Sequence, residues 1–334
     1  MRIVISGASG FVGRMLLERL LHGRAADGTP VVDQVPTDVS IVALVHKPAS
    51  LVLLKEVHPD LEVHRVDGWD DLGLESMVLG ADVFFHLAWS SVPRIAAQDP
   101  ARDVRENVEG GLRLLNGISN AGVRRFVFLS SGGTVYGSRT GAPITEDVPV
   151  DPTNAYACGK VCFEQYLRER AEHHGFEQVI LRPSNLYGDP SGPTKQQGVV
   201  EHWFGSIAAG RAIDAWHGLD VTRDYLHIDD MVEVLLAAMT KPVQTSTFNV
   251  GTGIGTSLSE LLSHMFEITG ITVPVNSPEK NPPDLPWNVL DPGLLQRSWG
   301  ITPKVPLRTG LERTWRSLQS RGYGSPNGPL SVQV

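Results

Sequence analysis

The sequence contains only two cysteines, Cys158 and Cys162, which stand four residues apart. Side chains at this spacing on a helix point alongside each other and are poorly placed for a disulfide, so we expect two reduced thiols. No metal site is expected either, because no second pair of ligands stands near these two sulfurs.

Long hydrophobic runs and basic runs are missing as well. No apolar stretch reaches the length that spans a membrane, and the chain enters a strand pattern at residues 2–5 without a signal peptide. The net charge of −8, with no Lys/Arg run, argues against a nucleic-acid partner. The 334 residues are 41% hydrophobic and 20% charged, which is typical of a soluble globular protein, and we expect a cytoplasmic location.

Short apolar runs alternate with helical patterns through the first half of the chain. This alternation predicts an α/β fold with a doubly wound parallel sheet, the Rossmann arrangement. We expect a dinucleotide-binding domain at 1–188, with sheet contributions from about 226–251, and a smaller C-terminal substrate-binding lobe within 189–334. Loops are expected at 23–40 and 276–287, and a flexible tail from 320. The predicted strands are 3–6, 41–45, 61–66, 83–88, 126–130 and 178–182, and the predicted helices are 11–22, 49–57, 74–79, 104–120 and 156–174.

A glycine-rich turn follows the first predicted strand and opens the first helix, with the sequence Gly7-Ala8-Ser9-Gly10-Phe11-Val12-Gly13. The glycines allow a tight turn and close approach of the backbone to a pyrophosphate. The pyrophosphate then lies at a helix N-terminus, where amide donors favour an anion. In this strand-to-helix context the motif predicts a dinucleotide cofactor.

The end of the second predicted strand lacks the carboxylate that would bind the adenosine ribose of NAD. His46 and Lys47 stand there instead and would suit a 2′-phosphate. The sequence therefore favours NADP over NAD, although both residues are also compatible with an ordinary surface loop.

Tyr156 and Lys160 share one face of a predicted helix. An ammonium beside a phenol favours the phenolate and lowers the pKa of the tyrosine towards neutrality. Tyr156 is then a usable general base, or in reverse a general acid, for a sugar or alcohol hydroxyl.

From Met1 to about Leu311 the chain resembles the extended short-chain dehydrogenase/reductase family, in its NAD-dependent epimerase/dehydratase branch, typified by UDP-glucose 4-epimerase. The resemblance rests on motifs in the family's order. After the glycine turn these are Val66-Asp67, His86-Leu87-Ala88, Asn107, the run SSGGTVYG at 130–137, PITED at 143–147, Tyr156 with Lys160, LRPSNLYG at 181–188 and RDY at 223–225.

The resemblance implies that Tyr156 exchanges a proton with O4 of a nucleotide-linked hexose while the nicotinamide takes hydride from C4. It further implies that Lys160 holds the nicotinamide ribose and that Asp67 binds the adenine edge. The residues expected to bind the cofactor are Gly7, Ser9, Gly10, Phe11, Val12, Gly13, His46, Lys47, Asp67, Gly68, Leu87, Ala88, Asn107, Ser130, Tyr156, Lys160, Arg182 and Pro183. Those expected to bind the substrate are Trp89, Ser90, Thr134, Asn185, Arg223 and Lys280.

Two positions depart from the family pattern. The catalytic Ser or Thr normally stands third in the motif that begins at Ser130, where this chain has Gly132. Ser131 or Thr134 must supply that hydroxyl, and we favour Thr134. An arginine that commonly binds the substrate diphosphate is also missing, and Lys280 is its candidate replacement.

These features favour a 4-epimerase of a nucleotide-diphosphate hexose. An NADPH-dependent reductase of a nucleotide-linked 4-keto-6-deoxyhexose is the alternative among enzymes. A 4,6-dehydratase is disfavoured because Gly132 and Gly133 offer no carboxylate beside the catalytic hydroxyl. A non-catalytic dinucleotide sensor would have no need of Tyr156 and Lys160. The family also implies a homodimer built on the helix that carries Tyr156.

Overall fold

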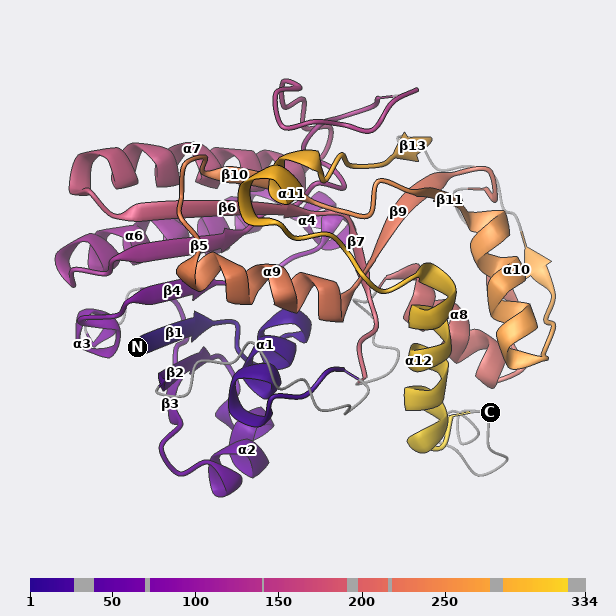
Figure 1. The fold of residues 1–334 in the computed structure, drawn as a ribbon, viewed down its shortest axis with the longest axis horizontal. Coiled ribbons are helices and arrows are strands. Elements are labelled where there is room, and N and C mark those ends of the chain that lie inside the picture. Colours follow the sequence, from indigo (N-terminus) through magenta and orange to yellow (C-terminus); the bar gives the residue numbers. More distant parts are fainter. Residues whose placement is uncertain are drawn as a thin grey trace.

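A parallel seven-stranded sheet forms the centre of the molecule (Figure 1). The computed structural model describes residues 1–26, 39–69, 73–139, 141–190, 198–215, 218–276 and 285–323. The strand order β10-β6-β5-β4-β1-β2-β3 contains the 3-2-1-4-5-6 order of a doubly wound sheet, which confirms the predicted fold class. The strands are β1 (Arg2–Ser6), β2 (Ser40–Val45), β3 (Glu62–Arg65), β4 (Val83–His86), β5 (Arg125–Leu129), β6 (Glu177–Pro183) and β10 (Thr247–Val250).

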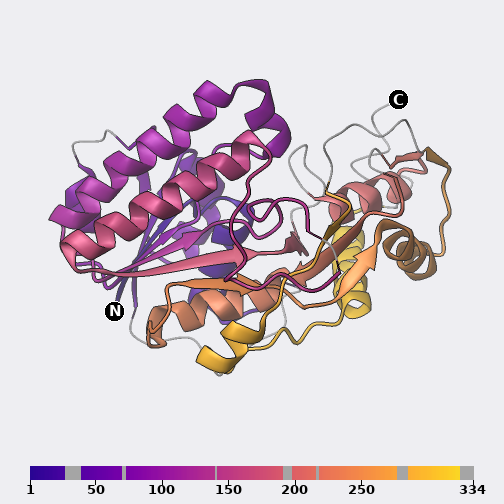
Figure 2. The same ribbon diagram turned by 90° about the horizontal axis from the view of Figure 1, so that it is seen from above.

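Helices cover both faces of this sheet (Figures 1 and 2). Successive side chains of a strand point to opposite faces. Ile3 and Ile5 therefore join one buried cluster, while Val4 joins the other. The first cluster lies under α1 (Phe11–His22), η1 (Pro48–Leu51), α2 (Val52–Val57), α9 (Ile228–Thr240) and α11 (Gly293–Trp299), and the second under α3 (Leu74–Val78), α6 (Gly110–Asn120) and α7 (Ala155–His174).

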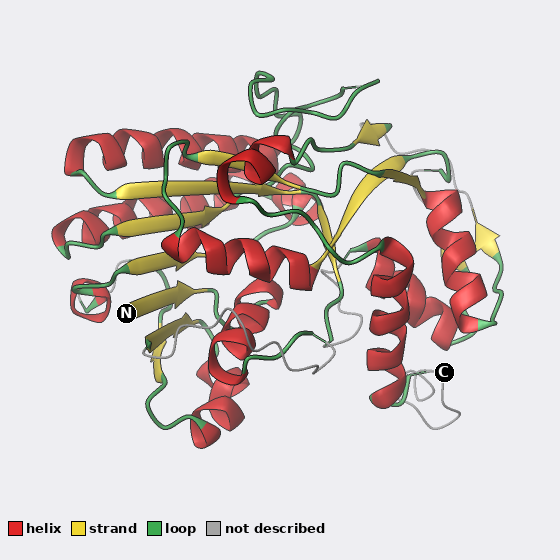
Figure 3. Ribbon diagram, viewed as in Figure 1, coloured by secondary structure: helices red, strands yellow, loops and turns green. Residues whose placement is uncertain are grey.

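A smaller lobe lies beyond the carboxyl ends of the central strands, at the right of Figures 1 and 3. Its core includes the large side chains of Trp203, Phe204 and Trp315. The elements of the lobe are the strands β7 (Asn185–Tyr187), β9 (Thr222–His227), β11 (Gly255–Ser257) and β13 (Trp287–Asn288), the pair β8 (Ile213–Asp214) and β12 (Val275–Asn276), and the helices α8 (Val199–Ala208), α10 (Leu258–Thr269) and α12 (Leu307–Ser320).

The helix predicted at 104–120 is interrupted. The chain forms α4 (Pro93–Gln98) and α5 (Pro100–Asp103), then a π-helical turn, η2 (Val104–Glu109), before α6. Periodicity alone does not reveal such a turn, and π turns are frequent at functional sites. At Gly111 an added Cβ would lie 2.5 Å from the Phe163 ring, so this glycine allows α6 to pack closely against α7.

Other expectations concern the loops and the termini. Residues 27–38 of the first expected loop, 277–284 of the second, and the tail from 324 lie outside the described residues. The short strand β13 begins at Trp287 within the expected second loop. Cys158 and Cys162 are free thiols, as predicted. Within the described ranges, no helix combines the length and apolarity that crossing a membrane requires.

Candidate active site

The glycine turn connects β1 to α1 and brings the chain against the end of β4. Gly7 has φ +73, and a Cβ there would lie 2.7 Å from the backbone nitrogen of Ala88. A Cβ on Gly13 would lie 2.2 Å from the Gly7 carbonyl oxygen, so α1 approaches the turn as closely as the backbone permits. The helix starts at Phe11, and its N-cap, Gly10, has no side chain that could occupy the first amides. The first amides of α1 are thus presented to an anion, which fits the pyrophosphate of a dinucleotide.

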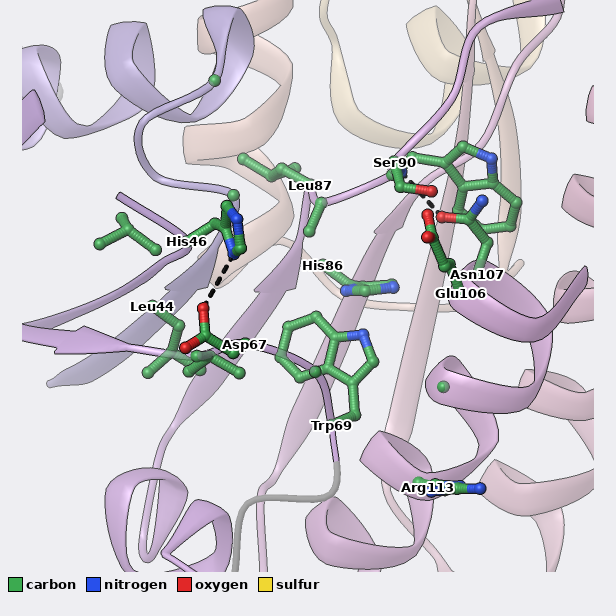
Figure 4. Close-up of a pocket in the computed structure, with 18 of the residues that line it drawn as sticks. Leu44, His46, Asp67, Trp69, His86, Leu87, Ser90, Glu106, Asn107 and Arg113 are labelled. Carbon is green, nitrogen blue, oxygen red and sulfur yellow. Dashed lines mark hydrogen bonds and ion pairs between the residues drawn. The ribbon is translucent and has the colours of Figure 1, made fainter. Parts of the chain in front are cut away.

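A cavity of about 870 Å³ opens above this turn (Figure 4). Figure 4 shows His46 and Asp67 on one side of it and Asn107 on the other, with Trp69 and His86 between. Of the residues expected to bind cofactor or substrate, the ones that line the cavity are Gly7, Ser9, Gly10, His46, Asp67, Gly68, Leu87, Ala88, Trp89, Ser90 and Asn107.

His46 and Asp67 contact each other at the adenosine end of this cavity. His46 Nδ1 lies 3.1 Å from Asp67 Oδ1, and Arg65 Nε lies 2.8 Å from Asp67 Oδ2. All three side chains are largely exposed. The imidazole expected to meet a 2′-phosphate is therefore held beside a carboxylate.

Ser130 and Arg182, two expected cofactor ligands, lie instead in a buried network behind the active site. Ser130 Oγ donates to Glu164 Oε1 at 2.5 Å, and Arg182 Nε donates to the same oxygen at 3.0 Å. Arg182 Nη1 also donates to the Tyr136 hydroxyl at 2.8 Å. Glu164, four residues after Lys160, accepts from both side chains in this structure, and their expected contact with the cofactor stays a prediction. The Pro183 carbonyl accepts from Gly132 N at 2.8 Å.

Helix α7 carries the predicted catalytic pair. Asn154 caps it by accepting from Ala157 N at 2.9 Å, which fixes the first turn and Tyr156 within it. Lys160 is 3% exposed and donates from Nζ to the Leu129 carbonyl at 2.8 Å. Its ammonium also lies 3.9 Å from the centroid of the Trp89 ring, a cation–π contact. Burial lowers the pKa of Lys160 to about 7.

The pKa of Tyr156 differs from the expectation. Burial raises it to about 12, against a smaller lowering by the hydrogen bond with Ser131. Lys160 does not lower it here, because the ammonium is drawn to the Leu129 carbonyl and lies 5.6 Å from the centroid of the Tyr156 ring. A positive charge closer to the phenol is needed before Tyr156 becomes an effective base.

The missing hydroxyl at Gly132 has a steric explanation. A Cβ at Gly132 would lie 2.4 Å from Leu290 Cδ1 and 2.9 Å from the Arg182 carbonyl oxygen, so no side chain fits there. Ser131, one residue earlier, lowers the pKa of Tyr156, against the larger effect of burial. The Thr134 hydroxyl lies 3.4 Å from that of Ser131. The influence of Ser131 on the phenol favours Ser131 over Thr134 as the hydroxyl that replaces the one missing at Gly132.

Two of the expected substrate residues, Asn185 and Arg223, come from strands of the lobe. Asn185 on β7 pairs in register with Tyr225 on β9, and Arg223 precedes Tyr225 by two residues on the same face. Asn185 Nδ2 is buried and has no hydrogen-bond partner among the described residues, so this donor is available to a ligand. A Cβ on Gly133 would lie 3.7 Å from Asn185 Oδ1 and 3.9 Å from Ser131 Oγ, which places Gly133 between the two. Lys280 lies outside the described residues.

Sequence reasoning did not identify Glu164 or Asp103. Glu164 continues the spacing of Tyr156 and Lys160 by one more helical turn, and this was a signal that could have been used. Asp103 lies on α5 and is 3% exposed, beside α7 at Gly159. Only the packing of α5 on α7 reveals it.

Comparison with known proteins agrees with this site. The model of the NAD dependent epimerase/dehydratase family matches residues 3–251. The UDP-glucose 4-epimerase of Mycolicibacterium smegmatis is 34% identical over 317 residues, which cover 94% of this chain and 97% of that protein. The UDP-glucose 4-epimerase of Thermotoga maritima, solved with UDP-glucose, superposes with a TM-score of 0.84 at 27% identity and covers 96% of this chain and 99% of its own.

A third similar protein bears on the cofactor. The UDP-glucose 4-epimerase of Thermus thermophilus, solved in complex with NAD, has a TM-score of 0.78 at 28% identity, with 96% of this chain and 99% of that chain covered. The expectation of NADP from His46 and Lys47 is not supported, since the matched family is NAD dependent and His46 is engaged with Asp67. With a glycine turn for the pyrophosphate and the Tyr156–Lys160 pair beside it, the chain belongs to the NAD dependent epimerase/dehydratase family and is an enzyme.

Proposed function

We propose that this enzyme is an NAD-dependent 4-epimerase of a nucleotide-diphosphate hexose, with UDP-glucose as the first substrate to test. The observation that carries the proposal is the placing of Tyr156 and Lys160 on one face of α7, with Lys160 Nζ fixed to the Leu129 carbonyl at the carboxyl end of β5 and Ser131 near enough to the phenol to lower the pKa of Tyr156. Similarity to UDP-glucose 4-epimerases over nearly the whole chain supports it.

The residues around the cavity fit NAD. Gly7 and Gly13 allow β4 and α1 to pack closely against the turn, and the amides at the start of α1 would bind the pyrophosphate. Asp67 would hold the adenosine end and Lys160 the nicotinamide ribose. When bound, NAD takes a hydride from C4 of the sugar and returns it to the opposite face.

Proton exchange at O4 belongs to Tyr156 and Ser131. As the C4–H bond breaks, the O4–H proton passes to the Tyr156 phenolate, and Ser131 donates a hydrogen bond that steadies the sugar oxygen. After the 4-keto sugar rotates to present its opposite face, Tyr156 would return the proton to O4 as hydride returns to C4. Electrons and protons then balance with no net consumption of the cofactor.

Residues of the lobe would hold the rest of the substrate. Asn185 presents its unpaired amide donor towards the sugar nucleotide, and Arg223 would pair with the diphosphate. Residues 189–334 supply most of this lobe, and Lys280 would add a further positive charge.

The matched pair Tyr156→Phe and Tyr166→Phe tests the function. Tyr166 lies on the same helix and is 42% exposed. We expect purified protein to carry NAD and to interconvert UDP-glucose and UDP-galactose, Tyr156→Phe to lose at least about 100-fold in kcat, and Tyr166→Phe to retain activity. Full turnover by Tyr156→Phe would refute the catalytic assignment. Stoichiometric oxidation of added NAD(P)H by a 4-keto-6-deoxyhexose nucleotide would instead identify the alternative reductase.

We also propose a homodimer that uses the outer faces of η2 and α7. Val104 and Tyr166 are 51% and 42% exposed and lie on two helices that contact each other, so both are accessible to a second copy of the chain. Light scattering on the purified protein tests this, with a dimer mass expected and a concentration-independent monomer mass excluding it.

A further inference from the structure

The Lys160 ammonium is surrounded mainly by rings. Its Nζ makes one hydrogen bond, to the Leu129 carbonyl, and lies 3.9 Å from the Trp89 centroid and 4.8 Å from that of Phe128. A buried ammonium with a single hydrogen bond loses its proton easily unless negative charge stands nearby. Lys160 must keep that proton if it is to favour the Tyr156 phenolate.

Three other titratable groups act on this pair. Glu164 and, less strongly, Asp103 raise the pKa of Lys160, against the larger lowering caused by burial, and the charge of Asp103 also raises the pKa of Tyr156. Glu164 already forms a tight ion pair with Arg182. His86 on β4 is buried among aromatic rings, and burial, aided by the Lys160 charge, lowers its pKa to about 3, so it is neutral. Asp103 is therefore the acidic group near Lys160 that no arginine neutralises among the ion pairs of the described residues.

The hydrogen bonds of Asp103 are unevenly shared between its two oxygens. Oδ1 accepts from the Ser91 hydroxyl and, at 2.9 Å, from Asn107 Nδ2. Oδ2 is buried and has no hydrogen-bond partner among the described residues. Burying a carboxylate oxygen without a hydrogen-bond partner costs free energy, and most buried polar atoms in folded proteins do have a partner. The unpartnered Oδ2 therefore needs an explanation.

The position of Oδ2 supplies that reason. A Cβ on Gly159 would lie 3.0 Å from Asp103 Oδ2 and 3.3 Å from Trp89 Cζ2, so the oxygen and the indole both lie against α7 one residue before Lys160. On the Oδ1 side, Ser91 and Asn107 connect Asp103 to the loop 88–91, and Asn107 also accepts from Ser90 N at 2.8 Å. This loop carries Trp89.

We propose that Asp103 is a positioning residue of the Tyr156–Lys160 pair: its buried charge keeps Lys160 an ammonium, and its hydrogen bonds hold the loop 88–91 so that Trp89 covers that ammonium. Asp103 touches neither cofactor nor sugar. The catalytic consequence rests on the proposed function, whereas the effect on Lys160 belongs to the free protein.

The decisive variant is Asp103→Asn, because it removes the charge and keeps the shape. The amide oxygen can still accept from Ser91 and Asn107, and the amide nitrogen takes the place of Oδ2. Asp99→Asn is the matched control, since Asp99 is an exposed acid that caps the same helix and asparagine caps equally well. Ser91→Ala is a second control that removes one hydrogen bond of Asp103 and leaves its charge.

Titration by NMR of full-length protein labelled at lysine ¹³Cε, without cofactor or sugar, measures Lys160 directly, with the signal assigned by Lys160→Gln. We expect Asp103→Asn to lower the pKa of Lys160 by about one unit or more and Asp99→Asn to leave it unchanged. Ser91→Ala, which loosens the loop 88–91 and keeps the Asp103 charge, should change it by much less than Asp103→Asn. An unchanged Lys160 titration in a folded Asp103→Asn protein overturns the proposal.

Turnover gives a second readout. A fall of one unit in the Lys160 pKa leaves about fivefold fewer protonated molecules at pH 7 and about twofold fewer at pH 6. Removal of the Asp103 charge also removes a cause that raises the pKa of Tyr156, and this partly offsets the loss. Asp103→Asn should therefore lose kcat by at most these factors, with a larger loss at pH 7 than at pH 6 and an unchanged KM. A merely structural role would lower the melting temperature and give a loss that does not vary with pH, and that outcome also overturns the proposal. Failure of Tyr156→Phe to lose activity would refute the proposed function and leave the NMR result to stand alone.

Discussion

Glu164 and Arg182 form a two-bond ion pair directly behind the catalytic helix. Arg182 Nε lies 3.0 Å from Glu164 Oε1, and Arg182 Nη2 lies 2.5 Å from Glu164 Oε2. Neither residue is more than 4% exposed. The hydrogen bonds with Arg182 and its positive charge hold the pKa of Glu164 below its usual value, against the opposing effect of burial. The pair joins α7 to β6 one turn beyond Lys160.

Replacing Glu164 by Gln is expected to destabilise the fold strongly. The substitution leaves the Arg182 charge buried without its counter-ion, which typically costs about 3–5 kcal/mol. Urea unfolding monitored by circular dichroism measures the change. Glu169→Gln, on the exposed side of the same helix, should change the free energy of unfolding by less than about 0.5 kcal/mol. Equal free energies of unfolding for the two variants would show that the buried ion pair contributes nothing to stability.

Ser131→Ala is expected to reduce kcat far more than Thr134→Ala. Ser131 lowers the pKa of Tyr156 and is the proposed donor to the sugar oxygen, and loss of a single donor at the reacting oxygen typically costs about 100- to 1000-fold. Thr134 contacts Ser131 and stands behind it, so its removal should cost less than about tenfold. Steady-state assays with UDP-glucose decide the order, and a larger loss for Thr134→Ala would restore the assignment favoured by the sequence.

Lys160→Met is expected to abolish turnover and to stabilise the protein at neutral pH. The pKa of Lys160 is about 7 in the folded protein and near 10.5 when unfolded, so between these values the unfolded chain binds more protons. The free energy of unfolding of the wild type therefore rises with pH in this window, by about 1 kcal/mol per unit.

The methionine variant lacks this rise. The difference between its free energy of unfolding and that of the wild type should be largest near pH 7 and should shrink as the pH approaches 9. Parallel urea titrations measure this difference. Lys55→Met, at an exposed site on α2, should show no such trend. If the stability of Lys160→Met relative to the wild type instead grows with pH, the lowered pKa of Lys160 is contradicted.

Gly132 and Gly133 are expected to respond oppositely to alanine. A methyl at Gly132 collides with Leu290 and with backbone, so Gly132→Ala should cost about 1–3 kcal/mol of stability. A methyl at Gly133 meets only ordinary contacts, and it lies between Ser131 and Asn185. Gly133→Ala should keep its melting temperature and raise KM for UDP-glucose. A stable Gly132→Ala protein with full activity would remove the steric explanation for the missing hydroxyl.

The sequence was enough to predict the central sheet, because buried parallel strands form uninterrupted apolar runs such as residues 3–6 and 83–88. It also identified Tyr156, Lys160 and the glycine turn, where local spacing carries the chemistry. The break in the helix at η2 was not predictable from periodicity, since a π turn keeps an amphipathic pattern. The ion pair of Arg182 with Glu164 was not predictable either, because the two side chains meet only after α7 packs on β6. The same applies to Asp103, whose neighbours Ser91 and Asn107 come from different segments.

The His46–Asp67 contact leads to a prediction about the cofactor. Asp67 places a carboxylate at the adenosine end of the cavity, and a 2′-phosphate brought there meets a like charge. The wild type should therefore bind NAD more tightly than NADP. Asp67→Asn removes the repulsion and frees His46, so the preference for NAD should fall by about tenfold or more.

Calorimetric titration of protein stripped of cofactor gives both dissociation constants. His46→Ala is the informative companion, because it leaves the Asp67 charge in place and removes the imidazole. If Asp67 sets the choice, His46→Ala still prefers NAD, since the remaining carboxylate is then less well neutralised. If His46 and Lys47 instead bind a 2′-phosphate, the wild type prefers NADP and His46→Ala loses that preference. The preference of the wild type for NAD or for NADP separates the two explanations, and the two variants show whether Asp67 or His46 sets it.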